Sequence, residues 1–227
     1  MLEIKIPTLT EAVNEKIRKM IVTGVLRPGE KINVDDLSRK FQVSPTPIRE
    51  ALGRLEQEGL AARIPRVGWQ VAKLSHAEFI FLHDFQKVLE QAICERILPL
   101  AEKIDFIHSR SINETMAFFV KTEQYDRILE ENEKFHMSLY EVCPNRILLE
   151  TLRNTWDNLK WQRRIMIASK EYLDRYFAEH MEILNALEAS DAPRVREAVD
   201  RHFHTGHLAL KDSLEEEEKE RTCFVHG

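Results

Sequence analysis

Apolar and polar positions between Val43 and Leu55 recur with the period of an amphipathic helix. At about 100° per residue, four apolar side chains fall on one side, and small, hydroxyl-bearing and charged residues fall on the other. The first group is Ile48, Ala51, Leu52 and Leu55, and the second is Thr46, Arg49, Glu50 and Gly53. Ser44 is expected to cap this helix through its hydroxyl, and Pro45 suits the first helical position because it has no amide to leave unpaired. The pattern predicts a short helix with a buried back and an outward polar face.

The neighbouring segments predict a small domain around this helix. Residues 36–41 predict a short helix, and the link at 42–43 gives helix-turn-helix spacing. Residues 60–64 and 69–72 predict two strands joined by a turn at 65–68, where Gly68 permits a hairpin tip. Residues 8–23 predict a further helix, and 32–34 an extended piece. Together they predict a winged helix-turn-helix whose second helix suits the major groove of DNA, although an ordinary surface helix has the same apolar stripe.

From residue 75 onward the apolar positions keep the period of helices, without strand-like alternation. Breaks such as Pro144-Asn145 and Asp191-Ala192-Pro193 separate predicted helices at 76–102, 109–121, 123–143, 145–168, 170–189 and 191–217. The fold class is therefore mainly α: a winged helix-turn-helix with a small β-hairpin wing at residues 1–74, an all-α bundle at 75–220 and a frayed tail at 221–227. Residues 1–7 are expected to form a loosely ordered arm.

Charge is divided unevenly between these two regions. Residues 1–75 contain 13 Lys and Arg against 9 Asp and Glu, a net charge of +4, whereas the rest of the chain carries −9. A basic head on an acidic body suits one domain that meets phosphate and one that does not. No apolar run is long enough to span a bilayer, and no signal-peptide core is present. The three cysteines are widely spaced, which favours a reducing, cytoplasmic location over a disulfide framework.

Three histidines lie on apolar stripes of three different predicted helices. Asn132 and His136 share one face one turn apart, and His180 and His202 lie on the inward faces of the last two helices. A single inward histidine is usually a core residue with a hydrogen-bond partner. Three that converge on one interior are also the arrangement that a divalent metal requires, with neutral imidazole nitrogens as ligands. Composition and spacing leave these two interpretations open.

The first 75 residues resemble the DNA-binding domain of GntR-family bacterial transcriptional regulators. The resemblance is carried by Gly24, Leu26, Pro28 to Lys31, Leu37, Val43-Ser44, Thr46 to Leu52, Arg54-Leu55, Glu58 to Leu60, Pro65-Arg66, Gly68 and Val71. It implies DNA contacts from the recognition helix and the wing, and Lys31 and Arg54 can also reach phosphates. The predicted DNA-binding set is Lys31, Ser44, Thr46, Arg49, Arg54, Arg66 and Gly68. Pro45 and Asp35 stand where members of the family have arginine, which leaves the operator sequence open.

The remaining chain resembles the all-helical ligand-binding domain of the FadR-type (FCD) branch of these regulators. The matching residues are Leu89-Glu90, Asn132, Phe135-His136, Leu139, Asn145, Glu179-His180, Ile183, Asp191 and His202. In that branch an Asp and three His hold Zn²⁺ or Ni²⁺, and the metal binds the carboxylate of a small organic acid. The resemblance implies a metal set of Asn132, His136, His180 and His202, with Asn132 in place of the aspartate. Gln86 replaces an arginine that holds the effector anion, and Arg163 or Arg164 is a candidate substitute.

These features together predict a DNA-binding regulator. We expect it to bind a near-palindromic operator in double-stranded DNA as a homodimer, because one such head contacts too little DNA for useful specificity. A small carboxylate bound beside a divalent metal, Zn or Ni, would control operator affinity, with repression relieved by ligand as the usual polarity in the family it resembles. The alternatives are a metal-responsive regulator in which the ion is the signal, and a metalloenzyme carrying a DNA-binding head. The prediction is a non-enzyme that does not bind membranes.

Overall fold

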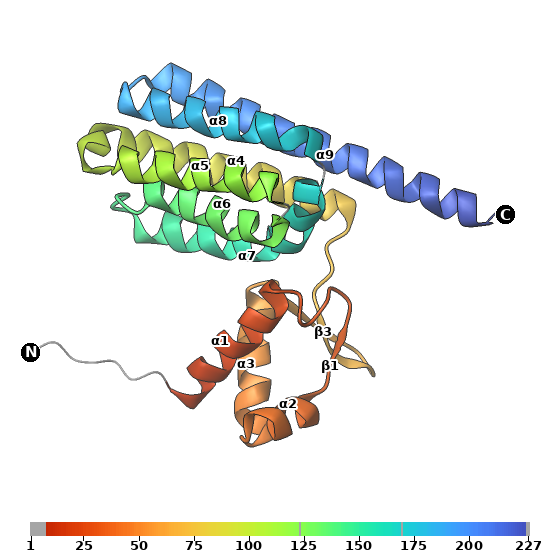
Figure 1. Cartoon of the computed structure of the whole chain (residues 1–227). Coiled ribbons are helices and arrows are strands. Elements are labelled where there is room, and N and C mark those ends of the chain that lie inside the picture. The colour runs from red at the N-terminus through yellow and green to blue at the C-terminus, as the bar shows by residue number, and fades with distance from the viewer. Residues whose placement is uncertain (1–7, 123, 169, 226–227) are drawn as a thin grey trace, which may run out of the picture. The chain divides into compact units, whose positions relative to one another are not determined.

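A computed structural model describes residues 8–122, 124–168 and 170–225. Within these ranges the side chains of residues 125–126, 161–162, 164–168, 170–171 and 213–225 are not described. The chain divides into two compact units, Met1–Ala77 and Glu78–Gly227. The first unit is a small helical domain with a three-stranded sheet, and the described residues of the second unit form helices and their connections (Figure 1). The mainly α fold predicted from the sequence is confirmed.

Three helices build the first unit: α1 (Leu9–Val22), α2 (Val34–Phe41) and α3 (Pro45–Gln57). Thr8 begins α1 with a capping box, in which its hydroxyl accepts from the Glu11 amide and the Glu11 carboxylate accepts from the Thr8 amide. Asn33 caps α2 by accepting from two amides. Gln42, between α2 and α3, has a left-handed backbone with φ 57°, which turns the chain from one helix into the next.

The cap of α3 differs from the sequence-based expectation. Ser44 has the extended backbone of an N-cap, but its hydroxyl makes no capping hydrogen bond. A capping hydroxyl accepts from the second or third amide of the helix. Here the third helical residue is Pro47, which has no amide hydrogen. The exposed Ser44 hydroxyl therefore remains available for an external partner.

A three-stranded antiparallel sheet of order β1-β3-β2 completes this unit. The strands are β1 (Lys31–Ile32), β2 (Ala61–Ile64) and β3 (Gly68–Val71). Ala61 pairs with Val71 and Ile64 with Gly68, so β2 and β3 form the predicted hairpin wing. Its turn uses left-handed backbones at Arg66 (φ 65°) and Gly68 (φ 104°). One apolar core joins the sheet to the apolar back of α3 and includes Val13, Ile17, Leu37, Ile48, Leu52, Leu55 and Val71.

The second unit is a helical bundle. Its elements are α4 (His76–Ile97), the short 3-10 helix η1 (Leu98–Lys103), α5 (Phe106–Lys121), α6 (Tyr125–Tyr140), α7 (Arg146–Ala168), α8 (Lys170–Glu188) and α9 (Ala192–Val225). Asn145 and Asp191 accept from amides of the first turns of α7 and α9, as the sequence breaks suggested. The helix α9 includes 221–225, part of the segment predicted to be a frayed tail, and residues 226–227 lie outside the described range.

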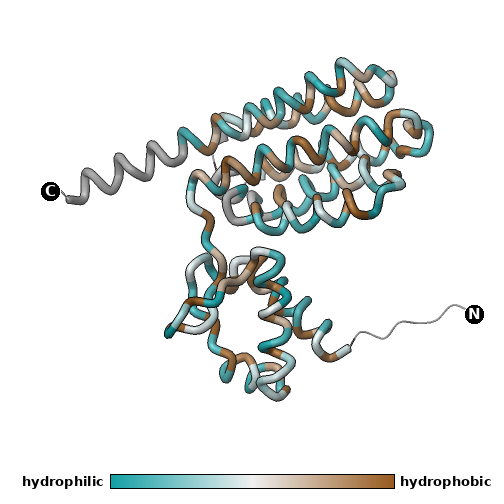
Figure 2. The backbone as a smooth tube through the Cα atoms, turned by 180° about the vertical axis from the view of Figure 1, so that it is seen from behind, coloured by the Kyte–Doolittle hydropathy of each residue, from teal (hydrophilic) through white to brown (hydrophobic). Residues whose placement is uncertain are grey.

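Amphipathic helices pack around one bundle core. The helix α5 packs against α6 and α8, and α9 packs against α7 and α8. Hydrophobic and hydrophilic residues alternate at short intervals along the coloured parts of the helices (Figure 2), as expected where one face of a helix is apolar and buried. The core is lined from α4 by Ile93 and Ile97, from α6 by Phe135 and Leu139, and from the other helices by Met116, Leu152, Leu184 and Val199. No helix in the described ranges is long and apolar enough to cross a bilayer.

Candidate functional site

The helix α3 presents a polar face to solvent in the first unit. Ile48, Ala51, Leu52 and Leu55 are fully buried, whereas Thr46, Arg49, Glu50 and Arg54 are exposed. The Glu50 carboxylate accepts from the Thr10 hydroxyl at 2.9 Å, which ties α3 to α1. The predicted opposition of a buried back and an outward polar face is therefore present in the structure.

The other sequence-predicted DNA-binding residues are exposed as well. Lys31 lies on β1, Ser44 at the start of α3, and Arg66 and Gly68 at the tip of the wing. No carboxylate among the described residues pairs with Lys31, Arg49, Arg54 or Arg66. A rigid helix and a hairpin tip with unpaired cations suit the phosphates and groove edges of a duplex.

The second unit brings three histidines together. His136 of α6, His180 of α8 and His202 of α9 are all buried, and one potential ligand atom from each lies within 4.8 Å of the other two. Their ring centroids are 4.7 to 5.4 Å apart. Residues separated by up to 66 positions in the sequence thus form one cluster, and each points a nitrogen donor toward a common centre.

The tautomer of His180 is fixed by Asn113 of α5. The Asn113 side-chain amide donates to the Phe177 carbonyl at 3.1 Å, so its own oxygen accepts from His180 Nδ1 at 3.0 Å. His180 Nε2 then carries a lone pair and has no hydrogen-bond partner among the described residues. Burial first, and the two other histidines second, hold the pKa of His180 well below its ordinary value. A buried, neutral, unpaired imidazole nitrogen is a metal ligand in its binding form.

A carboxylate lies behind each of the other two histidines. Glu90 of α4 lies 3.5 Å from His136 Nδ1, and Glu179 lies 3.6 Å from His202 Nδ1. Glu90 is fully buried and accepts from Tyr140 and Gln86. Burial by itself raises the pKa of Glu90, but the nearby His136 and the hydrogen bond from Gln86 outweigh it and lower the pKa to about 2.

Glu179 receives its own support from α8 and α9. It accepts from Thr205 at 2.6 Å and from Arg175 at 3.1 Å. Nδ1 of each of the three histidines therefore has an oxygen at 3.0 to 3.6 Å, and at His180 this contact is a hydrogen bond of the kind that orients metal-binding imidazoles in proteins. The donor set, its burial and the unpaired His180 nitrogen fit a divalent ion held by His136, His180 and His202.

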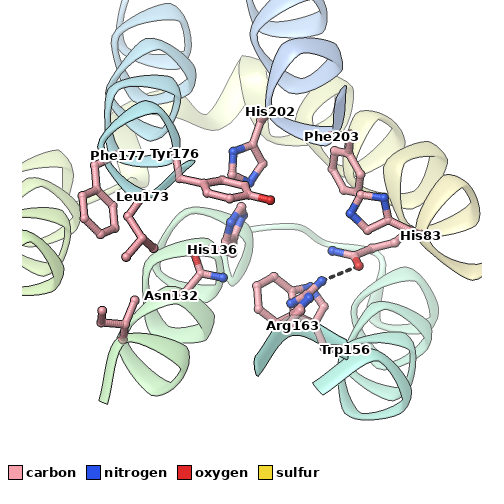
Figure 3. A pocket seen from close by; sticks show the side chains of 12 residues that line it. His83, Asn132, His136, Trp156, Arg163, Leu173, Tyr176, Phe177, His202 and Phe203 are labelled. Carbon is pink, nitrogen blue, oxygen red and sulfur yellow. Dashed lines mark hydrogen bonds between the residues drawn. The ribbon is translucent and has the colours of Figure 1, made fainter. Parts of the chain in front are cut away.

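A cavity of about 50 Å³ opens beside the cluster and is lined by His136, His202 and Asn132 (Figure 3). Two predicted effector-binding residues, Gln86 and Arg163, line the same cavity and are joined by a hydrogen bond from the arginine to the glutamine oxygen. The guanidinium of Arg163 lies 3.5 Å above the ring centroid of Trp156. Its Nη1 is buried without a hydrogen-bond partner. Burial lowers the pKa of Arg163 to about 10, so it stays charged at neutral pH. The side chain of Arg164 lies outside the described residues.

Sequence reasoning missed two residues that line this cavity, His83 and Tyr176, and one buried beside the histidines, Glu90. His83 is buried, lines the cavity and lies 4.7 Å from the His207 ring between centroids. Tyr176 turns its hydroxyl into the same space (Figure 3), where it has no partner among the described residues. Glu90 was noted for the family pattern but given no role beside the histidines. His83 and Glu90 lie seven residues apart on α4, a spacing that places them on one helix face and is the signal that could have linked them.

Comparisons with known proteins agree with this division of the chain. Residues 9–71 match the model of bacterial regulatory proteins of the gntR family, and residues 82–205 match the FCD domain. The chain is 28% identical over 202 residues to the HTH-type transcriptional regulator YdhC of Bacillus subtilis (strain 168). The aligned residues cover 88% of this chain and 90% of that protein. It is 25% identical over 201 residues to the HTH-type transcriptional repressor RspR of Escherichia coli (strain K12), which covers 86% and 87%.

The fold also has solved counterparts. The structure of E. coli McbR/YncC superposes with a TM-score of 0.78 at 18% identity, covering 92% of this chain and all of that one. The winged head, the helical bundle and the two family matches support one assignment. The chain belongs to the GntR family of bacterial regulatory proteins and is a DNA-binding transcriptional regulator with an FCD domain.

Proposed function

We propose that a small organic acid, bound beside a divalent metal in the helical bundle, controls the affinity of this regulator for its operator. The observation that carries the proposal is the cluster of His136, His180 and His202, with ligand atoms within 4.8 Å, beside a cavity that contains a buried arginine. The histidines, together with Asn132, would hold Zn²⁺ or Ni²⁺. A bound ion would supply a Lewis-acid site for a carboxylate.

Residues of the bundle would bind the part of the acid that does not contact the metal. Arg163 is held over Trp156 and by Gln86, with one nitrogen free to donate to an anion. A charge-assisted hydrogen bond in such a buried place is worth more than one at the surface. We therefore assign anion binding to Arg163, with Gln86 as the residue that positions it.

The head would bind DNA through α3 and the wing, in a homodimer on a near-palindromic operator. Thr46 and Arg49 would enter the major groove, with Ser44, Lys31, Arg54, Arg66 and Gly68 at its edges and backbone. The acid would bind the bundle more tightly when the two heads are in one arrangement than in another. Operator affinity would then shift by that difference in binding free energy and by no more. Relief of repression is the polarity we propose.

The proposal is tested with the full-length protein and an operator selected from a pool of random duplexes. Fluorescence anisotropy gives the operator Kd for Zn²⁺-loaded and chelator-treated protein, with and without a panel of small carboxylic acids. We expect at least one acid to change Kd for the loaded protein and to lose that effect after chelation. An operator Kd that follows metal alone would instead indicate a metal-responsive regulator. A Kd unmoved by metal and acids would overturn the proposal.

A further inference from the structure

With a divalent ion bound, one carboxylate would not balance the positive charge around the cavity. His136, His180, His202 and Asn132 are all uncharged ligands, so none offsets the charge of a divalent ion. Arg163 adds a buried positive charge, since only 8% of the residue is exposed. The buried carboxylate of Glu90 is linked to Arg163 through Gln86. The Gln86 side-chain amide donates to Glu90, and its oxygen accepts from Arg163. Glu90 therefore offsets Arg163, and both charges of the ion remain.

The other nearby carboxylates are already paired with cations outside the cavity. Glu179 accepts from Arg175, and Glu133 pairs with Lys160 at 2.8 Å. Buried charge without a counter-charge is costly. A ligand carrying two negative charges would balance the site, whereas a monoacid would leave one positive charge uncompensated.

The cavity also has a place for a second acid group. Four buried polar atoms on its walls have no hydrogen-bond partner among the described residues: Arg163 Nη1, Trp156 Nε1, Tyr176 Oη and His83 Nδ1. Arginine and tryptophan nitrogens can only donate, and the tyrosine hydroxyl can donate as well. Native proteins leave few such groups unpaired, so a cluster of donors on one cavity indicates a ligand rich in acceptor oxygens.

We infer that the effector is a compact dicarboxylate, with one carboxylate at the histidine cluster and the other at Arg163 and Tyr176. This inference rests on the proposed function and names the class of acid. An acidic ligand in place of Asn132 would supply one negative charge to the ion. Because Asn132 is neutral, the bound acid must supply two negative charges instead of one. A cavity of about 50 Å³ holds only a few water molecules at roughly 10–15 Å³ each, which favours a small acid over a long one.

Isothermal titration calorimetry on the Zn²⁺-loaded, full-length protein tests this with two pairs of probes: malonate against propionate, and succinate against butyrate. Each pair has the same number of carbons and differs in one carboxylate. In at least one pair we expect the diacid to bind about tenfold more tightly or better, the value of a hydrogen-bonded buried charge. Equal binding of diacid and monoacid in both pairs overturns the inference.

Two substitutions locate the source of the preference. Arg163→Met removes the second anion contact, so the preferred diacid should lose about tenfold or more in affinity while its monoacid changes little. Arg153→Met is the matched control, because Arg153 lies on the same helix and pairs with Glu141 outside the cavity. Retention of the diacid preference in Arg163→Met contradicts the assigned contact.

Asn132→Asp tests the charge balance directly. It adds one negative charge beside the histidines, so the diacid preference should shrink about tenfold and the Zn²⁺ affinity should rise. An unchanged preference overturns the charge argument. If this variant does not fold, the affinities of diacid and monoacid for the unaltered protein still test whether the effector is a dicarboxylate.

The failures of the two proposals are distinguishable. If monoacids bind as well as diacids and also shift operator affinity, the dicarboxylate inference fails and the proposed function stands. If none of the four probe acids binds the Zn²⁺-loaded protein, the dicarboxylate inference fails, and the operator Kd with the wider panel of acids decides the proposed function separately.

Discussion

Arg49 on α3 and Arg163 on α7 carry the same charge in opposite surroundings. Arg49 is exposed, and no carboxylate of the described residues pairs with it. Arg163 is buried, stacked on Trp156 and hydrogen-bonded to Gln86. An exposed cation costs little to keep and adds modestly to binding, whereas a buried one is maintained only by specific neighbours.

The same contrast applies to the two regions as wholes. The DNA-binding face is a set of independent exposed groups on a rigid helix and a hairpin, so its affinity should be shared among many contacts and depend on salt. The cavity is a connected network in which Arg163, Gln86, Glu90, Tyr140 and His136 follow one another. We therefore expect single substitutions to have larger effects in the bundle than in the head.

The largest effect is expected for His202→Ala. Loss of one of three imidazole ligands should weaken Zn²⁺ binding by more than about 100-fold, beyond what loss of an outer partner costs. Competition with a chromophoric chelator measures it. The matched control is His204→Ala, since His204 lies two residues along α9 and is exposed. Equal Zn²⁺ affinities of the two variants would show that the cluster is not the metal site.

A smaller effect is expected for Asn113→Leu, which removes the group that holds His180 in its metal-binding tautomer. Zn²⁺ affinity should fall by about 10- to 100-fold, the usual cost of losing an outer partner of a ligand. Ser109→Ala on the same helix is the control, because Ser109 bonds to Ser138 rather than to a histidine. If both variants lower the melting temperature equally and neither changes Zn²⁺ affinity, Asn113 is only structural.

In the head, Arg49→Ala should weaken operator binding by about 1–2 kcal/mol, roughly tenfold. Anisotropy titrations at several salt concentrations separate a phosphate contact, which reduces the salt slope by about one, from a base contact. Lys19→Ala removes an equal charge from an exposed position on α1, outside the predicted face. Undiminished operator binding in Arg49→Ala would rule out the assigned face of α3.

The smallest effect is expected at the wing tip. Gly68 has φ +104°, and a methyl group added to it would meet no atom within 4 Å. Gly68→Ala therefore introduces backbone strain of about 1–2 kcal/mol without a clash. Urea denaturation of the full-length protein should show this loss in the first unit, and operator affinity should fall less than in Arg49→Ala. A fall larger than that of Arg49→Ala would mean that the wing, and not α3, dominates DNA binding.

The sequence predicted the helices and strands well because periodicity is a local property. The stripe of Ile48, Ala51, Leu52 and Leu55 and the hairpin around Gly68 follow from neighbours within a few positions. Even local chemistry had one exception. The Ser44 hydroxyl makes no capping hydrogen bond, and Pro47 removes one of the two amides that such a hydroxyl can bond.

The sequence by itself determined which side chains face inward, including His136, His180 and His202, since a helix fixes the direction of every residue relative to its neighbours. It did not determine what those side chains meet. The Asn113–His180 bond joins residues 67 positions apart, and Arg163 and Gln86 are 77 apart. Such contacts depend on how α4, α5, α7 and α8 pack together, and packing is set by the fit of whole helix surfaces rather than by any local pattern. Only the tertiary structure therefore decided that three inward histidines share one centre and that a buried arginine lies across the cavity from them.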